Sequence, residues 1–128
     1  MIGNIRVLIV DNQPRARQSL KALLATWPQA KEIREATVAQ EAMHLIQESQ
    51  PDVVLMDVRM PEVDGLEVTR LIKTRWPQVK VVVLTMYTEY ASAAMLAGAD
   101  AFICIGEPPG KLLTTLAAVA KGQLSKTS

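Results

Sequence analysis

Two kinds of segment alternate along the chain: short apolar runs, and longer stretches with apolar residues every three or four positions. Continuous runs of β-branched and aliphatic residues are typical of strands that are covered on both faces. Three such runs are clear, and they cover residues 6–10, 53–56 and 79–84. Two weaker runs, 32–36 and 101–105, complete five predicted strands. Charged residues within 32–36 indicate that this strand lies at the edge of the sheet.

The segments between the runs predict amphipathic helices, because a spacing of three and four residues puts apolar side chains on one helical face. The clear stripes consist of Ala16, Leu20, Leu23, Leu24 and Trp27; Ala39, Met43 and Ile46; Val68, Leu71, Ile72 and Trp76; and Leu112, Leu113, Leu116, Val119 and Ala120. Thr37 with Gln40, and Asp64 with Glu67, have the spacing of N-terminal helix caps. Residues 90–97 are alanine-rich and more weakly patterned, and Gly122 is a natural stop for the last helix.

Five strands that alternate with five helices predict a parallel sheet with right-handed crossovers. The expected fold is therefore α/β, a flavodoxin-like, doubly wound, five-stranded parallel sheet in the order 2-1-3-4-5 with helices on both faces. One domain over residues 1–122 accounts for the pattern. Residues 123–128 are polar, and we expect them to be a tail or the start of a missing linker.

Composition narrows the classes of protein that remain. The chain has 128 residues, of which 49% are hydrophobic, and this is enough for one domain with a proper core. The net charge of +1 does not favour a nucleic-acid surface. The single cysteine, Cys104, cannot form an internal disulfide. Neither a signal peptide nor a membrane span is apparent in the sequence, so we expect a cytoplasmic protein.

Polar residues follow the strands at the edge where ligands bind in open α/β sheets. Asp11 and Asn12 come after the first strand, Asp57 ends the third, Thr85 follows the fourth, and Ile105 ends the fifth. Two carboxylates and an amide oxygen at one point favour a hard cation such as Mg²⁺. A carboxylate in such a site can act as a nucleophile toward phosphorus, and a nearby hydroxyl can hydrogen-bond the phosphoryl group.

Structural explanations exist for each of these residues alone. Aspartate after a strand is common in turns, and Asn12 ahead of Pro14 could be a helix cap. Their joint placement at one crevice favours a site. A flavin or dinucleotide is disfavoured because residues 11–15 contain no glycine and begin with an acid. His44 is expected on a helix surface and Cys104 in the core.

Four segments together resemble the receiver domains of two-component response regulators, and their sequences are most similar to those of the NarL/LuxR-like subgroup. These segments are Val10-Asp11-Asn12; Asp57-Val58-Arg59-Met60-Pro61 with Asp64-Gly65; Leu84-Thr85-Met86-Tyr87; and Ala97-Gly98-Ala99-Asp100-Ala101-Phe102. The resemblance extends from Arg6 to Gly122.

The resemblance implies a role for each matched position. Asp57 would accept a phosphoryl group from a sensor histidine kinase. Asp11 would hold Mg²⁺ through water, and the backbone carbonyl of Arg59 would bind the metal directly. Thr85 would shift toward the phosphoryl group, and Phe102 would be the aromatic side chain that rotates with it.

Two positions depart from the family pattern. Asn12 replaces the second acid of the metal-binding pair, and Ile105 replaces the lysine that contacts the phosphoryl oxygens. Lys111 lies too far along the chain to replace that lysine. Loss of both groups leaves the formal charge of the site unchanged, so we hypothesise that the substitutions compensate one another. The missing contact corresponds to about 1.5–3 kcal/mol, which impairs phosphotransfer without abolishing it.

Two functions remain open. The chain is a phosphoacceptor switch with weakened Mg²⁺ binding, in which enzymatic activity is at most slow phosphotransfer and autophosphatase chemistry. Alternatively it is a pseudo-receiver, a module for protein–protein interaction or dimerisation in which Asp57 is a relic. Neither function includes membrane or nucleic-acid contact by this domain. NarL/LuxR-like proteins usually continue into a DNA-binding domain, so the chain is either a single-domain regulator or a fragment.

Overall fold

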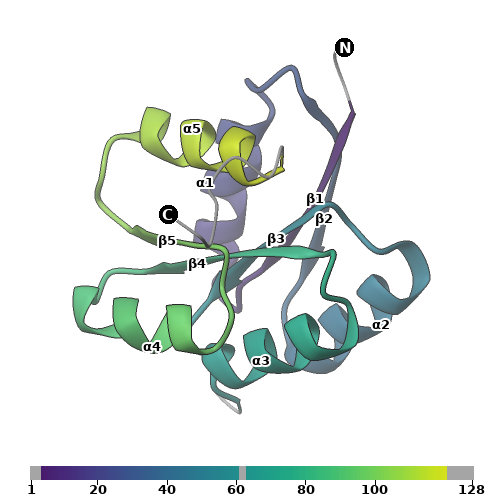
Figure 1. Ribbon diagram of the computed structural model, residues 1–128. Coiled ribbons are helices and arrows are strands. Elements are labelled where there is room, and N and C mark those ends of the chain that lie inside the picture. Colours follow the sequence, from purple (N-terminus) through teal and green to yellow (C-terminus); the bar gives the residue numbers. More distant parts are fainter. Residues whose placement is uncertain (1–3, 61–62, 121–128) are drawn as a thin grey trace.

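A single five-stranded parallel sheet forms the centre of the molecule (Figure 1), and its strand order is β2-β1-β3-β4-β5. The computed structural model describes residues 4–60 and 63–120. In chain order the elements are β1 (Ile5–Val10), α1 (Pro14–Leu24), β2 (Ala30–Ala36), α2 (Ala39–Ser49), β3 (Val53–Asp57), α3 (Gly65–Arg75), β4 (Lys80–Thr85), the 3-10 turn η1 (Thr88–Tyr90), α4 (Ala91–Leu96), β5 (Ala101–Cys104) and α5 (Pro109–Ala120). The predicted fold class and strand order are confirmed.

The helices cover both faces of this sheet, so the protein has two apolar cores (Figure 1). Helices α1 and α5 lie on one face, and α2, α3 and α4 lie on the other. Along β1, Val7 and Ile9 point into the α1–α5 core, whereas Leu8 and Val10 point into the α2–α4 core. Because every residue of such a strand is covered, the central strands appear in the sequence as unbroken apolar runs.

The edge strand β2 is confirmed, although it begins at Ala30 rather than at residue 32. The other strand boundaries differ from the predicted ones by one residue. Helix α1 ends at Leu24, so the predicted stripe was wrong to include Trp27, which is buried after the helix. The weakly patterned stretch 90–97 divides into η1 and α4. Gly122, Pro61 and the tail 123–128 lie outside the described residues.

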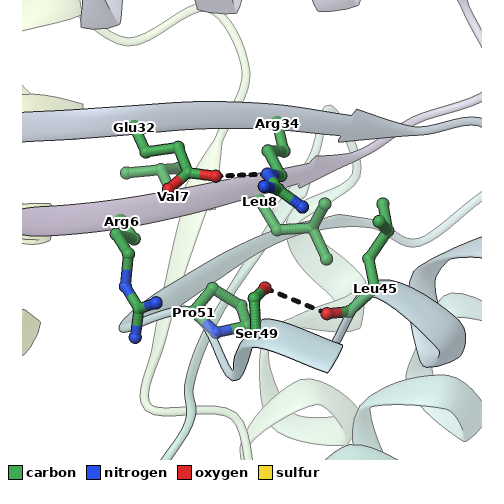
Figure 2. Close-up of a pocket in the computed structure, with 8 residues that line it drawn as sticks. All are labelled: Arg6, Val7, Leu8, Glu32, Arg34, Leu45, Ser49 and Pro51. Carbon is green, nitrogen blue, oxygen red and sulfur yellow. Dashed lines mark hydrogen bonds and ion pairs between the residues drawn. The ribbon is translucent and has the colours of Figure 1, made fainter. Parts of the chain in front are cut away.

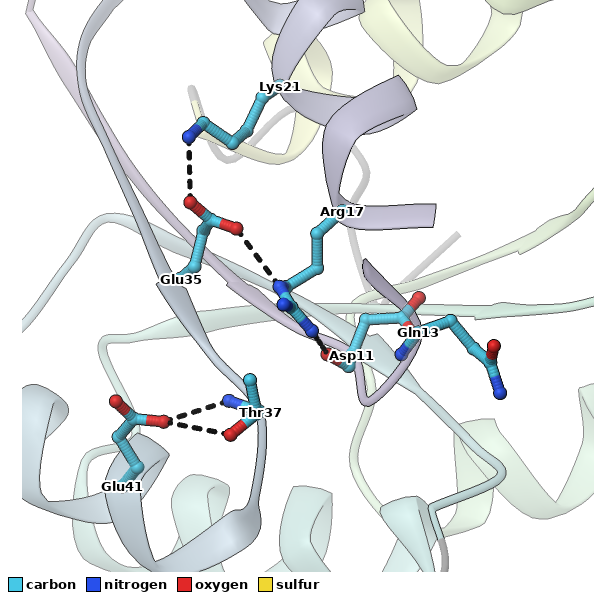
Figure 3. A network of polar contacts seen from close by, with 7 residues as sticks. All are labelled: Asp11, Gln13, Arg17, Lys21, Glu35, Thr37 and Glu41. Atoms are coloured by element: carbon cyan, nitrogen blue, oxygen red, sulfur yellow. Dashed lines mark hydrogen bonds and ion pairs between the residues drawn. The ribbon is translucent and has the colours of Figure 1, made fainter. Parts of the chain in front are cut away.

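Helix caps explain where α2 and α3 begin. The side chain of Asp64 accepts a hydrogen bond from the backbone N–H of Leu66 at 2.9 Å, so the predicted cap of α3 is confirmed. The predicted pairing of Thr37 with Gln40 was wrong. Helix α2 starts one residue later than expected, and Glu41 accepts from the backbone N–H of Thr37 at 2.9 Å (Figure 3). A glutamate in the first turn also suits the positive end of the helix dipole.

Within residues 4–60 and 63–120, no helix combines the length and the apolar character needed to cross a membrane.

Candidate functional site

A cleft of about 410 Å³ opens at the carboxyl edge of the sheet, above the neighbouring strands β1 and β3. The strand order reverses there, because the chain passes from β1 to β2 on one side and then returns to β3 on the other. The described residues that line it are Asp11, Asn12, Gln13, Ala16, Asp57, Arg59, Met60, Thr85, Met86, Tyr87 and Ile105. Except for Ala16, which lies in α1, they come from the ends of four different strands or from the residues just after them. The structure therefore brings together all the predicted site residues except Phe102.

Asp11 and Asp57 are the two carboxylates of this cleft. Asp11 is only 6% exposed, and its Oδ1 accepts a hydrogen bond from the backbone N–H of Gln13 at 2.8 Å. Asp57 is half-buried, and its Oδ1 accepts from the backbone N–H of Arg59 at 3.2 Å. Each carboxylate is thus fixed by a backbone group two residues further along. These bonds leave further carboxylate lone pairs for a ligand.

Burial raises the pKa of Asp57 to about 6, and the negative charge of Asp11 adds to this effect. The backbone N–H and the positive charge of Arg59 act in the opposite direction. Burial also raises the pKa of Asp11, against the hydrogen bond from Gln13 and the charge of Arg17. Two acids that are costly to ionise side by side form a site that gains from a bound cation.

The shift at Asp57 predicts how stability depends on pH. Its pKa in the folded protein lies above the ordinary value of 3.8, so the ionised side chain opposes folding. The penalty is absent below the ordinary pKa and grows as pH rises toward about 6. Because Asp57 is only half-buried, solvent screening limits this penalty to roughly 1–2 kcal/mol.

Asp57→Asn should therefore stabilise the metal-free protein near neutral pH and have little effect near pH 4. Urea denaturation in EDTA across this range measures the difference, with the exposed carboxylate Glu89→Gln as a matched control. A stabilisation by Asp57→Asn that is equally large at both ends of the range would contradict the prediction.

Mg²⁺ fits the donor set of the cleft, which consists of oxygen atoms. Mg²⁺ binds proteins through one or two carboxylates and retains several waters. Nowhere in the described parts of the chain do three or more His, Cys, Asp or Glu gather as a metal cluster. The two carboxylates and the neutral amide of Asn12 would therefore offer a cation less negative charge than a group of three acids.

Thr85 lies in the wall of the cleft with its hydroxyl already oriented. The backbone N–H of Tyr87 donates to Thr85 Oγ1 at 3.2 Å. Because the oxygen is used as an acceptor, the hydroxyl proton can be donated to a ligand. Ile105 also lines the cleft and is 51% exposed, and its side chain carries no amine. Lys111 is engaged elsewhere, since its Nζ lies 2.9 Å from Glu107 Oε2.

Phe102 lies outside the cleft. It lies in β5, and its half-buried ring packs against the core on the α2–α4 face of the sheet, the face on which α4 contacts β5. Its predicted switch role therefore concerns the α4 face and not direct contact with a ligand.

Arg17 connects the backbone of Asp11 to the edge strand β2 (Figure 3). Its Nη1 donates to the backbone carbonyl of Asp11 at 2.7 Å, and its Nε donates to Glu35 at 3.0 Å. Lys21 binds the other oxygen of Glu35 at 2.8 Å. These contacts hold the end of β1 against α1, which fixes the direction in which Asp11 points.

Sequence reasoning missed the side chains of Arg59 and Tyr87. It identifies only the backbone carbonyl of Arg59 as a site group, and it assigns no role to Tyr87. Each follows a site residue by two positions, Asp57 and Thr85 respectively, so each leaves its strand at the same edge of the sheet. That spacing is the signal in the sequence that points to them.

The structural explanations for neighbouring residues had mixed outcomes. Asn12 is not a helix cap, because Gln13 occupies the N-cap position of α1. His44 is exposed on α2, as expected. Cys104 is half-buried rather than in the core, since it ends the short edge strand β5.

A second cavity among Arg6, Leu8 and Arg34 (Figure 2) holds only about 10 Å³, which is room for a single water.

Comparison with known proteins identifies the fold and its family. The model of the family described as "Response regulator receiver domain" matches residues 7–117. The transcriptional regulatory protein DegU of Brevibacillus brevis is 31% identical over 122 residues, which are 94% of this chain and 52% of DegU. The chain spans about half the length of the curated relatives it matches.

Solved structures agree. A LuxR-family two-component response regulator from Aurantimonas sp. SI85-9A1 has a TM-score of 0.88 and 30% identity, covering 94% of this chain and 87% of that one. The response regulator TrrA from Thermotoga maritima, in complex with Mg²⁺-BeF, has a TM-score of 0.82 and 29% identity, covering 90% of this chain and 98% of that one. The chain therefore belongs to the receiver domains of two-component response regulators, with LuxR-family regulators among its relatives.

Proposed function

We propose that this receiver domain is a phosphoacceptor switch in which Asp57 takes a phosphoryl group from a sensor histidine kinase, with Mg²⁺ as cofactor. The observation that carries the proposal is the position of Asp57, half-buried beside Asp11 and Thr85 in a cleft that solvent reaches. TrrA, which shares this fold, was solved with Mg²⁺-BeF bound.

The chemistry is a transfer between two nucleophiles. A carboxylate oxygen of Asp57 attacks phosphorus, a P–O bond forms, and the P–N bond to the donor imidazole breaks with its electron pair on nitrogen. The hydroxyl of Thr85 donates a hydrogen bond to a phosphoryl oxygen. When the signal is switched off, water attacks phosphorus and releases inorganic phosphate, which restores the carboxylate.

Asp11, Asn12, Asp57 and the backbone carbonyl of Arg59 would hold the metal. When bound, Mg²⁺ supplies positive charge for the equatorial oxygens of the transferring group. The chain itself contributes a nucleophile that the backbone N–H of Arg59 holds in place at 3.2 Å. Asn12 offers no negative charge to the metal, so the metal binds weakly, and Ile105 offers no positive charge to the phosphoryl group, so transfer is slow.

The test uses a small phosphodonor in place of the kinase. The protein is incubated with Mg²⁺ and acetyl phosphate, and intact mass is recorded over time. We expect a gain of one phosphoryl group in the wild type and none in Asp57→Asn. Wild-type protein that gains no mass at millimolar donor, or an adduct that persists in Asp57→Asn, would overturn the proposal.

Restoring both missing groups should increase reactivity. The exposed side chain of Ile105 leaves room for a lysine, whose contact with a phosphoryl oxygen is worth about 1.5–3 kcal/mol, or roughly ten- to a hundredfold in rate. Asn12→Asp adds charge at the metal. Because each substitution offsets the charge of the other, the logarithm of the rate should rise more in Asn12→Asp with Ile105→Lys than the two single increases added together.

The rates of adduct formation in the two single variants and the double variant measure this coupling. Ile105→Met serves as the neutral control of similar length. Strictly additive single effects would show that Asn12 and Ile105 do not compensate one another.

The exposure of Ile105 favours a second candidate function, a pseudo-receiver that acts by binding a protein partner or a second copy without phosphorylation. An apolar side chain at the mouth of the cleft suits a protein contact better than an anionic ligand. In that case the self-association or partner binding of the chain would be the same in the wild type and in Asp57→Asn, with and without phosphodonor. Sedimentation of both proteins distinguishes the two functions.

A further inference from the structure

Arg59 is the one cationic side chain among the described residues that line the cleft. The other charged lining residues are Asp11 and Asp57, both negative. An oxyanion bound at Asp57 would be repelled by Asp11 and would need positive charge besides that of a metal. Of the cleft-lining side chains that the structure describes, only this guanidinium can supply that charge.

Tyr87 holds the guanidinium at the cleft. Arg59 Nη1 donates to the Tyr87 hydroxyl at 2.6 Å, and the guanidinium carbon lies 5.0 Å from the centre of the tyrosine ring. Tyr87 is itself fixed, because its backbone N–H donates to Thr85 Oγ1 and its ring forms a T-shaped contact with that of Tyr90, with the ring centres 6.2 Å apart. An exposed arginine would otherwise lose conformational entropy on binding a ligand. Here part of that ordering is already present.

We propose that Arg59 supplies the cationic contact to the phosphoryl oxygens at Asp57 in place of the amine that Ile105 lacks, and that Tyr87 is its positioning residue. The inference rests on the proposed function, because it assigns a residue to the same site. One N–H of the guanidinium is used by Tyr87, and the planar group retains other donors with the geometry that phosphate oxygens match.

The assignment changes the charge argument for Asn12 and Ile105. With Arg59 included, the cleft contains one fixed cation opposite two carboxylates. The loss of a lysine is then offset by an arginine just beyond β3, the strand that carries Asp57. Arginine remains charged throughout the physiological pH range, so this contact should not vary with pH.

The test measures binding of fluoroberyllate with Mg²⁺ by calorimetry and by ¹⁹F NMR. Arg59→Gln should weaken fluoroberyllate binding about tenfold or more, and Arg59→Lys should restore part of it. Tyr87→Leu should weaken binding less than Arg59→Gln does. Tyr87→Phe should have a smaller effect still, because phenylalanine keeps the ring that the guanidinium contacts. The control is Arg75→Gln, which removes an exposed arginine that also contacts a ring, Trp76 at 4.7 Å, at the far end of α3.

A second readout separates an electrostatic role from a structural one. With Mg²⁺ alone, Arg59→Gln should leave metal affinity unchanged or tighten it a few-fold, because a cation near two carboxylates is removed. Damage to the site would weaken both metal and anion binding. Adding Ile105→Lys to Arg59→Gln should recover fluoroberyllate affinity.

The outcomes are distinct. Wild-type protein that does not bind fluoroberyllate overturns the proposed function and this inference with it. Wild-type binding that Arg59→Gln leaves unchanged, or that falls together with Mg²⁺ affinity, overturns the role of Arg59 and leaves Asp57 as phosphoacceptor. Equal binding by wild type and Tyr87→Leu overturns the positioning role.

Discussion

Gly65→Ala is expected to lower the free energy of unfolding by about 3 kcal/mol. A Cβ atom on Gly65 would lie 2.2 Å from the carbonyl oxygen of Asp57 and 2.8 Å from the Cα of Val58. Both are backbone atoms at the end of a buried strand, so no flexible side chain can move aside. The start of α3 therefore packs directly on the strand end that presents Asp57, and the substitution should disturb the site as well as the fold.

Urea denaturation measures the loss, and fluoroberyllate binding reports the displacement of Asp57. Gly110→Ala is the matched control, because a Cβ there meets no atom within 4 Å and alanine favours the helical conformation of α5. The control should be neutral or slightly stabilising. A loss below about 1 kcal/mol for Gly65→Ala would show that α3 can move away from β3 at little cost.

Asp100→Ala should cost about 3 kcal/mol through a buried charge. The side chain of Asp100 is 4% exposed and that of Lys73 is 11% exposed, and their Oδ2 and Nζ atoms lie 2.9 Å apart. Asp100 also accepts from the backbone N–H of Val81 at 2.9 Å. The variant removes both interactions, and the ammonium of Lys73, which also donates to the carbonyl oxygens of Pro77 and Val79, loses the negative charge opposite it.

A double variant separates these two contributions. Lys73→Met with Asp100→Asn removes both charges and keeps an amide oxygen for Val81, but it also removes the Lys73 Nζ hydrogen bonds to the carbonyl oxygens of Pro77 and Val79. It should therefore lose less than Asp100→Ala, about 2 kcal/mol. Chemical denaturation of the two proteins gives the comparison. If the double variant is as unstable as Asp100→Ala, the loss of the opposite charge is not the main cause.

The strand order was predictable because the physical rules that determine it act over short stretches of sequence. The unbroken apolar run over residues 53–56 identifies a strand covered on both faces, and the charged run over 32–36 identifies an edge. Alternation with helices then leaves few topologies. The strand ends follow directly from that order, which is why Asp11, Asp57 and Thr85 are predictable as neighbours in one cleft.

Other features depend on distances that a local pattern does not contain. Arg59 and Tyr87 are 28 positions apart, and only the pairing of β3 with β4 brings their side chains together. The start of α2 differs from the expected one by a single residue, which is enough to exchange Gln40 for Glu41 as the partner of Thr37. An apolar strand predicts that Cys104 lies in the core, but β5 ends there and leaves it half-buried.

The two tryptophans give the protein a built-in pair of optical reporters, one for each apolar core. Trp27 belongs to the α1–α5 core and Trp76 to the α2–α4 core. Both precede strands and so lie at the amino edge of the sheet, away from the cleft. Trp27→Phe and Trp76→Phe would each leave one emitter, so the melting of either layer could be followed separately. Coincident fluorescence transitions would mean that the two layers unfold as one cooperative unit.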